Sequence, residues 1–415
     1  MCACLGIGGA CSSFDQDPCD PVDISCSLPG LLLYIYNVPS IYVGATISPS
    51  LGQANWQVRR LDPDGALVWE RSFYEGVVGS NPITAVSAAP DGGVFVYGIS
   101  DLSGGGDHYL RKLTGAGVDI FERTWGQPGG ESGASMDVDA AGNAYIVGTF
   151  NNGANDDWWL KKFDANGVED ASGWNKVLNG AANLTDTPRG LHVSTDGFVY
   201  VSGSMDDGAG LEGAIRKYAL DGTEIIAGWN KRFGTNSNCS IACAMASDAA
   251  GNLYVAANLN VGNNNWYIRK FAPDGTEFGG RWPFQLDQAG GNDVAFSVRV
   301  GPTQEIIVSG WIDPLATGTQ LEGLFLRLSV DGEELWRYRT NLGSETDNYV
   351  GVDVDAFGRS YFAGAVSFTG APTNFDRSLL RLDSAGRLDS NANWQGAPQD
   401  AGFGQSDFYI TLDIQ

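Results

Sequence analysis

The stretch that decides the fold begins with Met136-Asp-Val-Asp139 and continues through Ala141-Gly-Asn-Ala-Tyr-Ile-Val-Gly148. Its alternating first part predicts a short strand, and the apolar run after the Gly-Asn turn predicts a second. Asp157-Trp-Trp-Leu-Lys-Lys-Phe163 predicts a third strand, which ends in the turn Asp164-Ala-Asn-Gly167, and a fourth strand is expected to lead to Trp174. Four short strands of this kind form an antiparallel meander that needs neighbours to bury both of its faces.

The same pattern occurs seven times, at intervals of 50 to 55 residues. The small residues that end the second strands are Gly44, Gly98, Gly148, Gly203, Ala257, Gly310 and Gly364. Each third strand carries a cation near its end, at Arg60, Lys112, Lys162, Lys217, Lys270, Arg327 and Arg381. Each unit also carries one tryptophan in its expected fourth strand, at Trp69, Trp125, Trp174, Trp229, Trp282, Trp336 and Trp394. Three markers in register predict an all-β, seven-bladed β-propeller of four-stranded antiparallel blades, with the tryptophans packed between blades.

The sequence motif of the units resembles the beta-propeller repeat of bacterial secreted and surface proteins. Asp139-Ala-Ala-Gly-Asn-Ala-Tyr-Ile-Val-Gly148 and Asp248-Ala-Ala-Gly-Asn-Leu-Tyr-Val-Ala-Ala257 carry the resemblance, which extends from Leu31 to Trp394. It implies an extracellular or cell-surface location and a mostly non-enzymatic, adhesive or structural role. Because that family shares no catalytic residue, the resemblance transfers no site to this chain.

The chain is expected to comprise a cysteine-rich arm at residues 1–30 and the propeller at residues 31–415. The predicted blades are residues 31–80, 81–130, 131–185, 186–238, 239–290, 291–345 and 346–400, with an extra terminal strand at 401–415. Two segments, Leu31–Tyr36 and Asp407–Ile414, compete for the inner strand of the first blade. The unused segment would be a template for pairing with a second copy of the chain. The apolar residues predicted to mediate that assembly are Leu31, Leu33, Ile35, Phe408, Ile410 and Leu412.

The cysteines point to an oxidising exterior. The arm holds five of the seven, namely Cys2, Cys4, Cys11, Cys19 and Cys26. Disulfides are favoured over zinc because the arm contains neither a histidine nor a Cys-x-x-Cys pair. An odd number leaves one thiol that is either buried or available to cross-link a second molecule. Cys239 and Cys243 are candidates for a structural disulfide in the propeller.

Charge and hydropathy exclude some partners. The net charge of −24 argues against nucleic acid and anionic lipid. No apolar run approaches the roughly 20 residues needed to span a bilayer as a helix. We therefore expect an extracellular or cell-surface protein.

Two polar features have both a functional and a structural interpretation. The repeated cations form either an anion-binding ring or, as we favour, a set of ion pairs and carbonyl caps between blades. The residues at the start of the third strands form a candidate ligand rim for glycans or Ca²⁺, or merely cover the blade edges. The candidate rim consists of Trp56, His108, Asp157, Trp158, Asn265 and Trp266. No loop has EF-hand spacing, so the Ca²⁺ signal is weak and no metal or other cofactor is predicted.

Catalysis finds little support in the sequence. The two histidines, His108 and His192, lie in no recognisable nucleophile or zinc motif. Paired carboxylates such as Asp137/Asp139 recur at the same place in the repeat, which explains them without chemistry. We therefore predict a non-catalytic structural protein that self-associates through its terminal strands and its arm. The alternative is an adhesin that binds a glycan or surface protein at its loop rim; a carboxylate-dependent glycosidase or lyase ranks last.

Overall fold

The computed structural model describes residues 39–50, 53–77, 83–101, 106–208, 210–234, 239, 242–288, 290–316, 320–340, 346–368, 371–396 and 408–414. The predicted arm with its five cysteines and the predicted strand Leu31–Tyr36 lie outside these residues.

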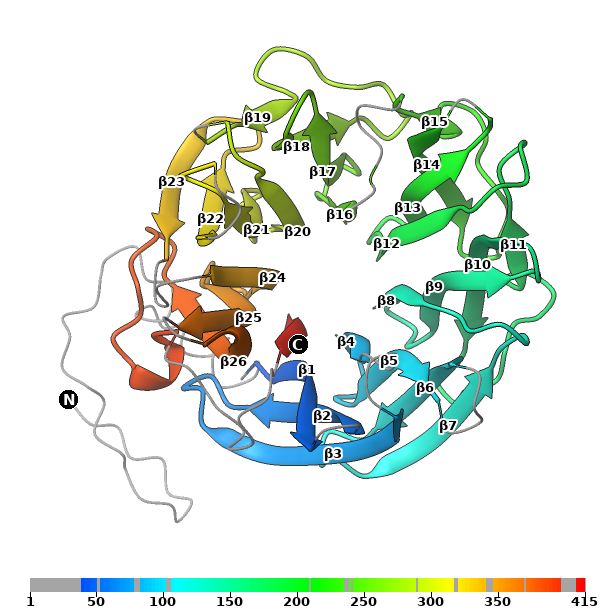
Figure 1. The fold of residues 1–415 in the computed structure, drawn as a ribbon, viewed down its shortest axis with the longest axis horizontal. Coiled ribbons are helices and arrows are strands. Elements are labelled where there is room, and N and C mark those ends of the chain that lie inside the picture. The colour runs from blue at the N-terminus through cyan, green and yellow to red at the C-terminus, as the bar shows by residue number, and fades with distance from the viewer. Residues whose placement is uncertain are drawn as a thin grey trace. The chain divides into compact units, whose positions relative to one another are not determined.

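The described strands form seven antiparallel sheets arranged as blades around a central channel, which confirms the predicted β-propeller (Figure 1). From the channel outward, blade 1 consists of β27 (Phe408–Ile414), β1 (Ile41–Ser50), β2 (Gln53–Leu61) and β3 (Leu67–Val77). Blade 2 is β4 (Ile83–Ala88), β5 (Val94–Ser100), β6 (Asp107–Leu113) and β7 (Asp119–Trp125). Blade 3 is β8 (Gly133–Val138), β9 (Ala144–Asn151), β10 (Asp156–Phe163) and β11 (Lys176–Leu178). Blade 4 is β12 (Thr187–Val193), β13 (Phe198–Asp206), β14 (Leu211–Ala219) and β15 (Lys231–Arg232).

The remaining blades follow the same order. Blade 5 is β16 (Ala244–Ser247), β17 (Leu253–Asn260), β18 (Asn264–Phe271) and β19 (Phe284–Leu286). Blade 6 is β20 (Val294–Val300), β21 (Ile306–Ile312), β22 (Glu322–Leu328) and β23 (Glu334–Arg339). Blade 7 is β24 (Thr346–Val354), β25 (Ser360–Phe368) and β26 (Ala371–Leu382), with the short 3₁₀ helix η3 (Ala392–Trp394) at its outer edge. An isolated bridge between Leu380 and Gln395 stands in place of a fourth strand in blade 7.

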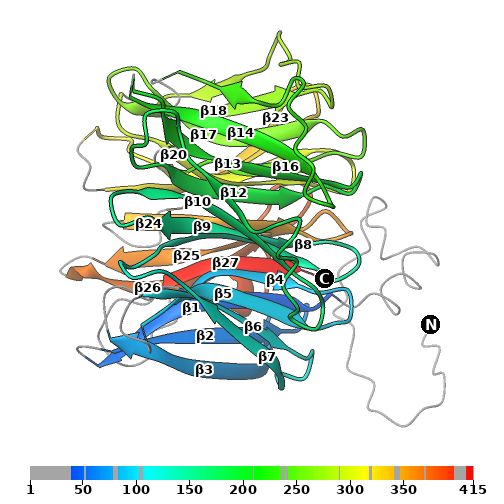
Figure 2. The same ribbon diagram turned by 90° about the vertical axis from the view of Figure 1, so that its right-hand side faces the viewer.

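The C-terminal strand closes the ring. Strand β27 pairs antiparallel with β1, with Ile414 opposite Ile41, and lies beside β24 and β4 (Figure 2). Leu412 is buried in the core between blades 7 and 1. The strand that carries Phe408, Ile410 and Leu412 is thus used within its own ring, so it is not the spare strand that the assembly hypothesis requires.

Aspartate-centred turns fix the inner hairpins. Asp139 accepts hydrogen bonds from the backbone amides of Ala141 and Asn143, both at 2.9 Å. Its second oxygen accepts from the Asn143 side chain and from the Tyr145 hydroxyl. A carboxylate that accepts several local donors stabilises the turn more than propensity alone would. The second aspartate of each Asp-x-Asp pair is therefore a turn residue.

The seven repeated cations hold neighbouring blades together, as the structural interpretation predicts. Each donates to a backbone carbonyl in the outer turn of the next blade, and we call this set the latch ring. The cation–acceptor pairs are Arg60–Gly115, Lys112–Ala165, Lys162–Leu220, Lys217–Pro273, Lys270–Val330, Arg327–Ser384 and Arg381–Pro63. The last pair joins blade 7 to blade 1, so the latch ring is continuous around the propeller.

A tryptophan shares the latch carbonyl in six blades. Its indole nitrogen donates to the oxygen that the cation also contacts, as in Trp229, which lies 2.9 Å from the oxygen of Pro273. The others are Trp69, Trp174, Trp282, Trp336 and Trp394. Some of these tryptophans lie on strands and some in loops, yet their indoles reach equivalent carbonyls. The predicted role of these six side chains between blades is confirmed.

Blade 2 departs from this pattern. Phe121 is the residue opposite Lys112, whereas Trp69 is the residue opposite Arg60 in blade 1. Trp125 lies opposite His108, at the other end of β7, and stacks on the rings of Tyr97 and His108. Trp125 thus lies in the fourth strand and packs between blades 2 and 3, as predicted, but it is not the register equivalent of Trp69. Counting residues along the chain placed Trp125 in the repeat, but strand register places Phe121 there.

Candidate functional site in the central channel

The central channel contains a cavity of about 170 Å³. Its wall is formed by the innermost strands of all seven blades, β27, β4, β8, β12, β16, β20 and β24. A second, more open cavity of about 190 Å³ lies where β4, β8 and β27 end, and it shares Asp413 with the first. The channel is therefore open to solvent at the end formed by the last residues of β4, β8 and β27.

One register position on the inner strands supplies most of the charged side chains that line the cavity, and we call it the channel ring; Arg189 lines the cavity from outside this position. Each member lies two residues before the turn and pairs with an aromatic or aliphatic residue of the adjacent strand. In blade order the members are Asp413, Ser87, Asp137, His192, Ala246, Arg299 and Asp353. The position is structurally equivalent in every blade, but its chemistry is not.

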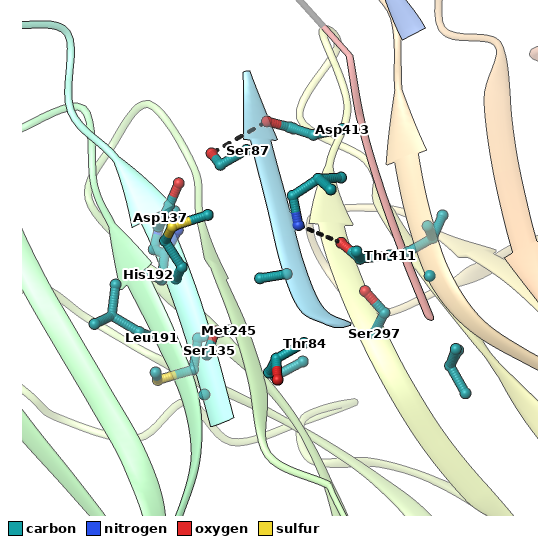
Figure 3. Close-up of a pocket in the computed structure, with 18 of the residues that line it drawn as sticks. Thr84, Ser87, Ser135, Asp137, Leu191, His192, Met245, Ser297, Thr411 and Asp413 are labelled. Atoms are coloured by element: carbon teal, nitrogen blue, oxygen red, sulfur yellow. Dashed lines mark hydrogen bonds and ion pairs between the residues drawn. The ribbon is translucent and has the colours of Figure 1, made fainter. Parts of the chain in front are cut away.

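Asp137, His192 and Ser247 form a hydrogen-bonded line across blades 3, 4 and 5. Nδ1 of His192 lies 3.3 Å from Oδ2 of Asp137, and its Nε2 lies 2.8 Å from the hydroxyl of Ser247. His192 and Asp137 both line the cavity (Figure 3). Burial alone would raise the pKa of Asp137, but the contact with His192, the Val193 amide and the Arg299 charge hold it below its usual value. Asp137 is therefore an anion that orients the imidazole.

Asp353 and Asp413 form a second cluster with Arg299. The Arg299 Nε lies 3.4 Å from Oδ1 of Asp353. Burial raises the pKa of Asp413 well above its ordinary value, and the adjacent Asp353 carboxylate raises it further, while Arg299 offsets only part of this. Burial would lower the pKa of Arg299, yet Asp353, Asp413 and Asp137 raise it, so the guanidinium stays charged. The folded structure therefore favours the protonated form of Asp413, whose carboxyl group is hydrogen-bonded to Asp353.

The same aspartates connect neighbouring blades. Asp137 accepts the Val193 amide at 2.8 Å, Asp353 accepts the Ile414 amide at 2.8 Å, and Asp413 accepts the Ala88 amide at 2.7 Å. Each bond joins one inner strand to the next blade. The carboxylates are thus held rigidly at the channel wall, which is what a preorganised site requires.

The predicted aromatic rim is part of the core. Trp56, Trp158 and Trp266 are fully buried between blades. The indole nitrogens of Trp158 and Trp266 donate to the backbone oxygens of Ser204 and Trp311. None of the three is placed to stack on a sugar. Alternation along the third strands turns these rings toward the adjacent blade, although polar neighbours made them look exposed.

The polar members of the predicted rim are buried as well. His108 contacts the Tyr97 hydroxyl through Nδ1 and the Thr149 carbonyl through Nε2, and burial lowers its pKa to about 4. Asp157 accepts a hydrogen bond from Asn152, and Asn265 accepts one from Asn263. These contacts organise the blade edge, so the side chains of the predicted rim are engaged within the protein.

Three further features concern the chain's surroundings. A disulfide joins Cys239 and Cys243, the pair singled out from the sequence. Within the described ranges, no three His, Cys, Asp or Glu side chains are grouped so as to hold a metal ion. No helix in the described part of the chain is long and apolar enough to cross a membrane. The disulfide is compatible with an extracellular or periplasmic location.

The sequence contains a signal for the channel ring in its recurring Asp-x-Asp pairs. The recurrence of Asp-x-Asp suggested one repeated role, but the two aspartates separate in the structure. Asp139 and Asp355 are turn residues that accept backbone amides, whereas Asp137 and Asp353 lie in the channel ring. Aligning the seven units at the position of Asp137 reveals His192 and Arg299 in the same place. A repeat position that carries different ionisable groups in different blades indicates a candidate site, and residue spacing alone does not reveal it.

Comparison with known proteins supports the fold. No protein-family model matches the chain, and no curated protein sequence matches it. The structure is similar to that of the periplasmic gluconolactonase of Pseudomonas aeruginosa, with a TM-score of 0.53 and 13% sequence identity over 88% of this chain and 98% of that one. A gluconolactonase of Xanthomonas campestris matches with a TM-score of 0.41 and 13% identity, over 77% of this chain and 91% of its own. A polysaccharide (ulvan) lyase matches with a TM-score of 0.47 and 11% identity, over 75% of this chain and 84% of its own.

These comparisons correct the predicted function. At 13% identity the Pseudomonas likeness shows that both chains are β-propellers, and the sequence family suggested by the repeat wording is not matched. The prediction of a non-catalytic structural subunit is corrected: the gluconolactonase whose structure matches 88% of this chain is an enzyme, so the propeller fold gives no ground for excluding catalysis. Because the predicted rim is buried, the basis for the adhesin alternative is lost, and the central channel is the candidate functional site.

Proposed function

We propose that the protein is a hydrolytic enzyme that cleaves a small polar ester or lactone in its central channel. The observation that carries the proposal is that one cavity is lined by the pair Asp137–His192, by Arg299 and by Asp413, whose pKa is raised by burial and by the adjacent Asp353 (Figure 3). A base, an acid and a cation around one cavity are the groups that acyl transfer to water requires.

The residues take distinct roles in this reaction. His192 removes a proton from the attacking oxygen, while Asp137 holds Nδ1–H and stabilises the imidazolium that forms. Arg299 supplies a fixed positive charge for the oxygen that becomes negative in the tetrahedral intermediate. Asp413 is a protonated acid on the opposite side of the cavity and can donate to the leaving oxygen (Figure 3).

Two observations support ester or lactone substrates in particular. The channel wall carries hydroxyl and charged side chains, including Ser87, Ser135 and Thr84, that suit a hydroxylated molecule. The fold is also that of a gluconolactonase, an enzyme named for a cyclic ester. The Cys239–Cys243 disulfide fits an enzyme that works outside the cytoplasm.

The test compares two chemically identical substitutions in blade 3. Asp137→Asn removes the anion behind His192, whereas Asp164→Asn changes an outer turn that accepts the Asn166 and Val168 amides. Initial rates are measured on a panel of sugar lactones and p-nitrophenyl esters between pH 5 and 9. We expect Asp137→Asn to lower kcat/KM by about 10²-fold or more and Asp164→Asn to leave it nearly unchanged. Equal rates in the two variants, or no turnover by the wild type on any substrate, would contradict the proposal.

A further inference from the structure

Ser247 differs from its equivalents in the other blades. It is the last residue of β16 and lies one residue after the channel ring. The equivalent residues are Ala88, Val138, Val193, Val300, Val354 and Ile414, all of them apolar. Blade 5 alone places a hydroxyl there, next to the only channel-ring histidine. The repeat therefore does not account for this serine.

The surroundings of Ser247 leave its hydroxyl within reach of solvent. The channel-ring residue of blade 5, Ala246, is buried in the core between blades 5 and 6. Ser247 itself is partly exposed at the end of its strand, and Ala249 and Ala250 just beyond it are exposed. A hydroxyl that is hydrogen-bonded to an imidazole and accessible to solvent meets the geometric requirement for a nucleophile.

From this geometry we infer that Ser247 is the nucleophile of the reaction and forms a covalent acyl intermediate with an ester or lactone substrate. The inference rests on the proposed function, because it names the group that His192 deprotonates. Nε2 of His192 is 2.8 Å from Oγ of Ser247, and Asp137 lies on the far side of the ring. The three side chains have the order of contacts that defines a Ser-His-Asp triad, on strands β16, β12 and β8.

The covalent step balances without any further reactant except water. Oγ of Ser247 bonds to the carbonyl carbon as its proton moves to Nε2 of His192. The bond from that carbon to the alkoxy oxygen then breaks as Asp413 gives its proton to the leaving oxygen, and His192 returns its proton to the Asp413 carboxylate by way of solvent water. Water attacks the acyl carbon, gives one proton to His192, and the carbon–Oγ bond breaks as Ser247 regains its proton. In a lactone the leaving hydroxyl stays attached to the acyl group, so the product is one hydroxy acid.

The experiment uses an alkyl fluorophosphonate as the probe, because it phosphonylates activated serines and releases fluoride. The full chain is incubated with the probe, and the modified peptide is identified by mass spectrometry. We expect a single modification at Ser247, its loss in Ser247→Ala, and a fall in labelling rate of at least about 10²-fold in His192→Ala. Ser329→Ala, in an outer turn of blade 6, is the matched control and should label at the wild-type rate.

Hydrolysis by the same variants separates the two proposals. Ser247→Ala should lose about 10³-fold in kcat/KM with an unchanged melting temperature. If Ser247 is not labelled and Ser247→Ala hydrolyses esters as fast as the wild type while Asp137→Asn does not, a water molecule is the nucleophile and this inference is overturned, although the proposed function stands. If no ester is hydrolysed and no serine is labelled, both are overturned.

Discussion

The latch ring and the channel ring are both sets of seven equivalent positions, but the latch ring is uniform in residue type and the channel ring is not. Every latch position is a lysine or arginine that donates to a carbonyl of the next blade. The channel ring contains three aspartates, a serine, a histidine, an alanine and an arginine at one register position. Packing requires the same chemistry in every blade, so uniformity indicates a structural role. Variation in a geometrically uniform position indicates that another requirement acts there.

The largest effect that separates the rings is expected in blade 4, which contributes His192 to one and Lys217 to the other. His192→Gln should lower kcat/KM on the best ester or lactone by about 10³-fold, because the amide cannot accept and return the proton. Lys217→Met should leave kcat/KM of the folded enzyme within about twofold, since the contacts it removes, with the Pro273 carbonyl and nearby aromatic rings, involve no residue that lines the cavity. The comparison fails if the two variants lose activity equally.

The second effect is on stability, and here a substitution at a latch contact should cost more than one near the channel. Trp229 is buried, donates to the Pro273 carbonyl and packs against Tyr200 with ring centroids 5.0 Å apart. Trp229→Ala should lower the free energy of unfolding by about 3 to 5 kcal/mol, the usual cost of removing a buried aromatic side chain. Urea denaturation measures this loss, and Ser247→Ala, next to the channel ring, is the control, with an expected loss below about 1 kcal/mol. A larger loss in Ser247→Ala than in Trp229→Ala would show that the main stabilising contacts do not lie in the latch ring.

These two rings also explain which parts of the structure the sequence predicts. Lys162 and Trp174 recur with their neighbours, so their spacing predicts both the blades and the contacts between them. Residue spacing does not predict the channel ring, because its members occupy equivalent strand positions but differ in residue type. Register matters too: Trp125 occupies the expected place by counting, while strand pairing puts Phe121 there. Residue spacing therefore predicts packing, and a site appears only after strands are placed side by side.

Ring closure and the loop rim show the same limit. Both Leu31–Tyr36 and the C-terminal segment have the pattern of an inner strand, and only three-dimensional pairing assigns β27 to blade 1. The ring of Trp158 looked available because Asp157 precedes it and a polar loop leads into its strand. Its burial depends on the neighbouring blade, where the Ser204 carbonyl accepts its indole N–H. Contacts between blades are non-local, and one blade's sequence does not specify them.

The third expected effect is the loss of stability that occurs when the buried Asp413 ionises as pH rises. The pKa of Asp413 is raised in the folded state by burial and by Asp353, so above pH 4 the folded protein binds more protons than the unfolded chain. Stability contributed by this group is present at low pH and is lost as pH rises toward the folded-state pKa. Asp413→Asn should remove that loss, so its stability relative to the wild type should be greater at pH 8 than at pH 4. The asparagine keeps an oxygen that can accept the Ala88 amide.

Urea denaturation of the wild type and Asp413→Asn at several pH values gives the difference directly. The Asp383→Asn variant, which alters an exposed outer turn, is the control for the substitution itself. Parallel pH profiles for wild type and Asp413→Asn would show that folding does not raise the pKa of Asp413. The stabilised variant should also lose hydrolytic activity, because the asparagine has no acidic proton to donate to the leaving oxygen.

The smallest effect is a gain in the latch ring. Blade 2 places Phe121 where six blades have an indole donating to the latch carbonyl, so the Ala165 oxygen receives Lys112 but no tryptophan. The turn glycine Gly167 lies against the Phe121 ring as Gly117 lies against Trp69, so the backbone is already shaped for an aromatic residue. Phe121→Trp should add one hydrogen bond and stabilise the protein by about 0.5 to 1 kcal/mol, which raises Tm by about 1 °C. Val118→Trp, in the exposed turn of the same blade, is the control and should give no gain. A loss of stability in Phe121→Trp would mean that blade 2 diverged at this position for packing and that the latch ring is less uniform than its carbonyl contacts indicate.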